Sequence, residues 1–148
     1  MKAAFLGLII ALASATMVAQ TTTATAAAPE VPASMRPFVP TNMKPYFLGL
    51  YLRAAEAADS PSPEAIQGHL AHLRAEVEAG KMLIVGPALD RGTLGGIAVM
   101  AVSTAEEAKQ ILDDDPMVKT GRMKSEVHPV WLPDLSAVQV IYSKAPAQ

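Results

Sequence analysis

The chain has 148 residues, no cysteine and a formal net charge of −2 at neutral pH. This length suits one domain, and the lack of cysteine excludes disulfides, thiolate nucleophiles and zinc sites built on thiolates. No basic run alternates with aromatic residues, so the composition excludes nucleic acid as a main partner.

The N-terminus has the pattern of a secretion signal. Lys2 gives a positive start, residues 3–19 are almost wholly apolar, and Ala-Thr-Ala at 24–26 fits the small-x-small cleavage pattern. The alternative is an uncleaved membrane anchor, but the apolar run is short for a bilayer span and no positive charge follows it. We therefore expect residues 1–26 to be a signal peptide. The mature protein would then be periplasmic or secreted, with no stable membrane span.

A proline-rich segment separates this signal from the folded body. Residues 27–43 contain four prolines, so we expect a disordered lead-in. The folded domain is expected over residues 44–133. It opens at Tyr46 with a continuous apolar run that ends at Leu52, and a run with two apolar faces predicts a central strand covered on both sides.

The first helix has clear signals at both ends. Ser62 suits the cap, Pro63 the first helical position and Glu64 the positive end of the helix dipole. Gly80 predicts that the helix ends near Ala79. One apolar stripe is expected to be buried, and its members are Ile66, Leu70, Leu73 and Val77.

A hairpin and a second helix follow. Residues 81–88 and 94–102 have the composition of strands, and the turn between them predicts a hairpin. Ser103 and Glu106 fit a capping box that begins the second helix. Pro116 ends this helix, because the residue before a proline is pushed out of the helical region.

A last strand completes the domain. Met123, Val127 and Trp131 alternate there with polar residues. Residues 134–148 form a C-terminal extension, in which 138–142 have the composition of a short fifth strand.

The element order is β-α-β-β-α-β, which predicts an α+β fold of ferredoxin-like topology. Both helices then lie on one face of the sheet. The apolar residues on the other face require cover, so we expect a homodimer.

Two histidines on the first helix are candidates for proton transfer, because an imidazole titrates near neutral pH. On a helical wheel, His69 lies at the border between the apolar stripe and solvent, whereas His72 lies on the solvent side. The alternative for His69 is a purely structural hydrogen bond at the edge of the core.

Three carboxylates crowd the end of the second helix, where they oppose the helix dipole. Pro116 displaces Asp115 from the helix, so its carboxylate can face an imidazole and fix its tautomer. We expect Asp113 and Asp114 to be solvated.

A metal site on the first helix is the less favoured alternative. His69, His72 and Glu76 have a spacing that could supply three ligands, but His72 is expected to face solvent. The sequence has no dinucleotide- or phosphate-binding glycine motif. It therefore predicts neither a metal nor a cofactor.

Several short motifs occur together in order over about residues 44–133. They are Gly68-His69-Leu70 with Leu73, Gly80, Val85-Gly86-Pro87-Ala88, Gly95-Gly96, Ser103 with Glu106 and Ala108, and Asp115-Pro116 with Gly121. In this combination the chain resembles the YciI-like (YCII-related) domain family.

The resemblance implies a dimeric α+β barrel with a His–Asp pair, here His69 and Asp115, and a cleft wall that includes Gly86 and Pro87. Met117 occupies a position where the family commonly has an aromatic residue, so it would alter the pocket. The implied activity is that of a small lyase or isomerase, like a dehydrochlorinase or a muconolactone isomerase, acting on a small organic molecule. The alternative is a non-catalytic module of the cell envelope for ligand binding or assembly.

Overall fold

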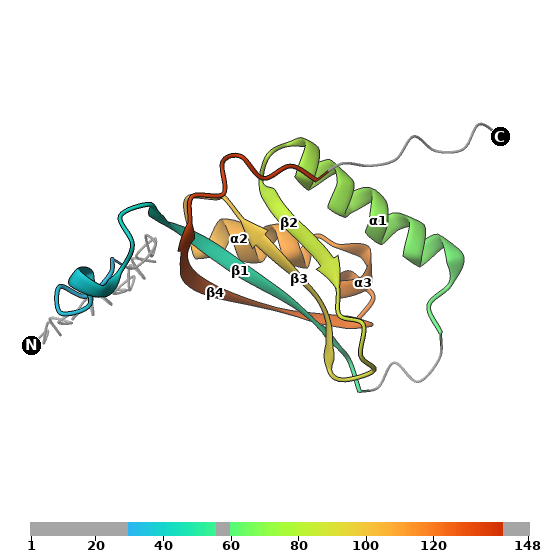
Figure 1. Cartoon of the computed structure of the whole chain (residues 1–148). Helices are drawn as coiled ribbons and strands as arrows, with labels where there is room; N and C mark the ends of the chain where they lie inside the picture. The colour runs from blue at the N-terminus through green and yellow to red at the C-terminus, as the bar shows by residue number, and fades with distance from the viewer. Residues whose placement is uncertain (1–29, 56–59, 141–148) are drawn as a thin grey trace, which may run out of the picture.

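A computed structural model describes residues 30–55 and 60–140 of the chain (Figure 1). The expected signal peptide at 1–26 lies outside these residues, as do positions 141 and 142 of the expected fifth strand. The elements in chain order are η1 (Arg36–Phe38), β1 (Met43–Arg53), α1 (Pro63–Glu78), β2 (Met82–Pro87), β3 (Leu94–Met100), α2 (Ala105–Asp113), α3 (Pro116–Lys119) and β4 (Met123–Pro133).

The four strands form one antiparallel sheet in the order β2-β3-β1-β4. Helices α1 and α2 pack on the same face of this sheet (Figure 1). The longest pairing joins β1 to β4, from Met43 opposite Pro133 to Arg53 opposite Met123. The fold is therefore α+β with ferredoxin-like topology, as the element order predicts.

The ends of α1 confirm the predicted signals. The Ser62 side chain accepts a hydrogen bond from the Ala65 amide at 3.2 Å, and Pro63 begins the helix. Gly80 follows the helix with φ of 73°, a left-handed conformation that glycine adopts without strain.

The cap of α2 differs from the prediction by one residue. Thr104, not Ser103, accepts from the Glu107 amide, and the Glu107 carboxylate accepts from the Ser103 amide. The reason is that Ser-x-x-Glu and Thr-x-x-Glu overlap in this segment, so spacing alone leaves two starting points.

The predicted buried stripe of α1 is wrong at its N-terminal half. Ile66 is 41% exposed and Leu70 is 56% exposed, whereas Leu73 and Val77 pack against the core. The helix turns Gly68 inward, where a Cβ would lie 3.3 Å from the Pro116 side chain. This close approach to α3 sets the inward face, and hydrophobicity alone does not reveal it.

The core lies between the sheet and the two longer helices. Its buried members are Phe47, Tyr51, Met82, Ala98, Met100, Ala108, Ile111 and Leu112. Gly49 lets α2 approach the sheet closely, because a Cβ there would lie 2.8 Å from Leu112 Cδ1.

The other face of the sheet carries apolar residues without a helix over them in the described part of the chain (Figure 1). Leu48, Leu50 and Leu52 of β1 are only half-buried there. Ile97 of β3, which pairs with Leu50, is exposed. The predicted cover over this face is thus not supplied by the described residues.

The segments flanking the domain also differ from expectation. The lead-in contains the 3-10 turn η1, in which Arg36 donates to the Val31 carbonyl and pairs with Glu30. Residues 138–140 form no strand. Across the described ranges, no helix has the length and apolar character needed to cross a membrane.

Candidate functional site

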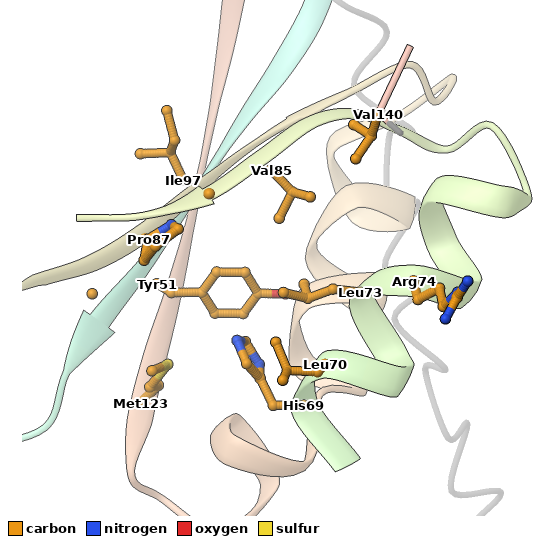
Figure 2. A pocket seen from close by; sticks show the side chains of 13 residues that line it. Tyr51, His69, Leu70, Leu73, Arg74, Val85, Pro87, Ile97, Met123 and Val140 are labelled. Atoms are coloured by element: carbon orange, nitrogen blue, oxygen red, sulfur yellow. The ribbon is translucent and has the colours of Figure 1, made fainter. Parts of the chain in front are cut away.

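A cavity of about 540 Å³ lies between α1 and the sheet (Figure 2). This volume is in the usual range for small-molecule pockets. Its polar side chains are those of Tyr51, His69 and Arg74. The rest of the wall is largely apolar and includes the side chains of Leu70, Leu73, Val85, Met123 and Val140.

The structure brings His69 and Asp115 together at this cavity. His69 Nδ1 lies 2.6 Å from Asp115 Oδ2, and the His69 side chain is 17% exposed. A carboxylate only accepts, so Nδ1 carries the proton and donates it to Asp115. The lone pair of the imidazole is then on Nε2, which has no hydrogen bond within the described residues.

Asp115 is held in place by a second interaction. It is 0% exposed, and its Oδ1 accepts from the Met117 amide at 2.8 Å as the N-cap of α3. Pro116 begins this helix and leaves Asp115 extended, with φ of −62° and ψ of 131°. The Asp-Pro sequence therefore turns the carboxylate away from α2 and toward α1.

Tyr51 forms another wall of the site. Its ring meets the His69 ring edge-on, with centroids 5.6 Å apart (Figure 2). Burial raises the pKa of the Tyr51 phenol far above its usual range, and the nearby Asp115 and Glu76 carboxylates raise it further. The phenol is therefore neutral and can serve only as a hydrogen-bond donor or neutral acceptor, not as a base.

Two buried polar atoms close to the pair have no hydrogen-bond partner within the described residues. They are the Tyr51 hydroxyl and Glu76 Oε2. Asp115 is near enough to shift the pKa of the phenol, but the hydroxyl oxygen does not reach hydrogen-bonding geometry with it. Because an unpaired buried polar group costs about 1–3 kcal/mol, the hydroxyl of Tyr51, which lines the cavity, favours a polar group of a ligand or a water molecule beside it.

The match to a known family covers the His69–Asp115 pair and all the cavity-lining residues except Val140. The model of the YCII-related domain matches residues 46–131, more than half of the chain. The chain belongs to the YCII-related domain family. The matched region contains His69 and Asp115 and ends before the C-terminal extension.

Among the solved structures that are similar to this chain is 5-chloro-2-hydroxyhydroquinone dehydrochlorinase (TftG) from Burkholderia phenoliruptrix, in complex with 2,5-dihydroxybenzoquinone. It shares 22% sequence identity at a TM-score of 0.43, over 56% of this chain and 90% of that chain. No curated protein matches the chain.

The prediction that His72 faces solvent is wrong. Its Nε2 lies 2.9 Å from the Ile111 carbonyl, so it donates to the C-terminal end of α2. The reason is that Gly68 lies on the inner face of α1, against Pro116, and His72 lies one helical turn further along the same face. Among the described residues, His69, His72 and Glu76 do not form a group that could hold a metal ion.

The other predicted site residues divide between the cavity and its surroundings. Gly86 and Pro87 line the cavity. Met117 does not; it is buried at the start of α3, where its amide binds Asp115. Asp114 pairs with Lys119 on the surface, which lowers the pKa of Asp114.

Asp113 is half-exposed but not free of contacts. Its carboxylate accepts from Ser125 of β4 and from Lys109 of α2. The hydrogen bond from Ser125 therefore connects α2 to the sheet. The prediction that Asp113 is only solvated is wrong in this respect.

Several residues that line the cavity were not identified from the sequence. Tyr51 was hidden in an apolar run, although a phenol among aliphatic residues was a usable signal. Leu70 was assigned to the core and instead lines the cavity. Arg74 and Val140 also line it, and nothing in their local sequence points to this position.

Proposed function

We propose that this YCII-related protein is a small lyase or isomerase acting on a small organic molecule in the cavity. The proposal is carried by the 2.6 Å contact between His69 Nδ1 and Asp115 Oδ2 at the cavity wall. Asp115 fixes the tautomer and orientation of the ring, and Nε2 is the general base. The apolar wall suits a ligand with a mostly apolar body.

The chemistry needs only proton transfer at one atom. His69 Nε2 takes a proton from a carbon that a neighbouring carbonyl group makes acidic. In an isomerase, the freed electron pair shifts a double bond and the imidazolium returns the proton to a second carbon. In a lyase, the electron pair forms a carbon–carbon double bond and expels a leaving group such as chloride, while the proton passes to solvent.

A substrate screen tests the proposal. Chlorinated hydroquinones and unsaturated lactones are assayed for turnover with the wild type, His69→Asn and Asp114→Asn. The expected result is turnover by the wild type and Asp114→Asn, with a loss of at least about 100-fold in His69→Asn. Undiminished turnover by a folded His69→Asn variant would overturn the proposal.

A non-catalytic module for ligand binding or assembly in the cell envelope is the second candidate. It is favoured by the apolar character of both the cavity and the open sheet face around Leu50. In that case His69→Asn and the wild type bind the same compounds, and neither converts any of them. Product analysis of the bound mixtures separates the two candidates.

We also propose that the protein is a homodimer through the open face of the sheet. Leu48, Leu50 and Leu52 supply an apolar surface that a second copy would cover. Sedimentation is expected to show a dimer in the wild type and a monomer in Leu50→Glu. A wild-type monomer at high concentration would overturn this assembly.

Export is the remaining part of the proposal. It rests on the signal pattern of residues 1–26. Intact mass of the protein recovered from outside the cytoplasm is expected to correspond to a start after residue 26. A mature species that begins at Met1 would contradict it.

A further inference from the structure

The C-terminal extension returns to the site. After β4 ends at Pro133, residues 134–140 leave the sheet and run across its end toward α1 (Figure 1). We call this segment the C-terminal strap. It follows the matched YCII-related region, which ends at residue 131.

The start of the strap is anchored by three contacts to β1 and the residue before it. The Asp134 amide donates to the Asn42 carbonyl at 2.8 Å, and the Asp134 carboxylate pairs with Lys44 at 2.7 Å. The Leu135 amide donates to the hydroxyl of the buried Tyr46 at 2.9 Å. A strap held in this way leaves the sheet in a fixed direction.

Two short-range hydrogen bonds shape the middle of the strap. The Ser136 amide donates to the Asp134 carboxylate at 2.9 Å, and the Val138 amide donates to the Leu135 carbonyl at 2.9 Å. They form a turn that points the following residues toward α1.

The far end of the strap reaches the cavity. Val140 lines it together with Leu70 and Leu73 of α1 and Val85 of β2 (Figure 2). Val138, two residues earlier on the same strap, is 40% exposed and is not a lining residue. The strap therefore contributes one apolar side chain to the site.

We propose that the C-terminal strap is part of the binding site and that Val140 sets the size of the ligand it accepts. This inference rests on the proposed function, because it assigns a wall to the same cavity. The Val140 methyl groups contact the apolar edge of a bound ring. A smaller side chain leaves that edge without contact, and a larger one shortens the cavity.

The absence of cysteine allows a direct test of where the strap lies. Val140→Cys and Val138→Cys each introduce a single thiol into the full chain, and its rate of reaction with 5,5′-dithiobis(2-nitrobenzoic acid) is measured. The thiol at position 140 is expected to react at least about tenfold more slowly. Tyr46→Phe removes the hydroxyl that accepts a hydrogen bond from the Leu135 amide. When it is added to each cysteine variant, the difference between the two reaction rates is expected to become smaller. Equal reaction rates of the thiols at positions 140 and 138 would overturn the proposal that the strap places residue 140 at the cavity wall.

A binding experiment tests the role of Val140 separately. The affinity for 1-naphthol is measured for the wild type, Val140→Ala and the matched control Val138→Ala. The expected loss of affinity is about fourfold for Val140→Ala, because about one methylene's worth of surface is no longer buried, and less than twofold for Val138→Ala. Equal affinity of Val140→Ala and the wild type overturns the role of Val140 and leaves the proposed function intact. A wild type that binds no 1-naphthol counts against both.

Discussion

His69 Nδ1 lies 2.6 Å from Asp115 Oδ2, although the two residues are 46 positions apart in the chain. The same carboxylate caps α3 through the Met117 amide and is fully buried. One side chain thus fixes both a helix and the tautomer of an imidazole. Changes to either residue should therefore affect stability as well as chemistry.

Replacement of His69 is expected to separate these two effects. His69→Ala leaves the buried Asp115 carboxylate without its partner on α1, and we expect the free energy of unfolding to fall by about 3 kcal/mol. His69→Asn places an amide N–H near the position of Nδ1, so the loss should be about 1 kcal/mol. Urea denaturation measures both. Equal losses would show that the contact with Asp115 does not stabilise the fold.

Asp115→Asn is expected to reverse the tautomer of His69. An asparagine still caps α3 through its carbonyl oxygen, but its amide then donates to Nδ1, and the proton moves to Nε2. Turnover should fall by about 100- to 10,000-fold with little loss of structure. Asp114→Asn is the control, because Asp114 pairs only on the surface. Equal activities of the two variants would argue against a general base at Nε2.

His72 is expected to support the fold and not the chemistry. His72→Ala removes the donor to the Ile111 carbonyl, which should lower the free energy of unfolding by about 1–2 kcal/mol while turnover is retained. Gln67→Ala, at an exposed position of α1, is the control and should change stability by less than about 0.5 kcal/mol. A His72→Ala variant as stable as the control would contradict the assigned contact.

The sequence predicted the elements well because their ends carry strong local signals. The ends of α1 are set by Ser62, Pro63 and Gly80 through side-chain capping and backbone conformation. These effects do not depend on distant parts of the chain. Asp115 was selected for a similar reason, since Pro116 dictates the local backbone. The proximity of Asp115 to His69 agrees with the position that the family resemblance implied.

The direction in which α1 faces could not be predicted in the same way. A helical wheel weighs Leu70 by its hydrophobicity and puts it in the core, whereas it lines a cavity. The inner face is set by the contact of Gly68 with Pro116, and this contact exists only in the folded chain. The same holds for Val140, which reaches the site through anchors on β1.

The strap is expected to respond to acid through Asp134. The hydrogen bond from Lys44, the hydrogen bonds with Ser136 and the charge of Lys44 together lower the pKa of Asp134 from 3.8 to about 2. Because the pKa is lowered in the folded state, the stabilisation of the strap by the Asp134 carboxylate is present above pH 3.8 and is lost as the pH falls toward 2. The Ser136 amide donates to Asp134, so its NMR shift reports the titration. A midpoint at 3.8 or above would contradict the pairing with Lys44.

The protonation of the His69 ring is the most direct test of the proposed proton-transfer site. A long-range ¹H–¹⁵N correlation spectrum of the histidine side chains, with the His69 signals assigned from their loss in His69→Asn, reads the tautomer without a substrate. In the neutral ring, the proposed site predicts a proton on Nδ1 and an unprotonated Nε2 facing the cavity. A proton on Nε2 with a bare Nδ1 would contradict it.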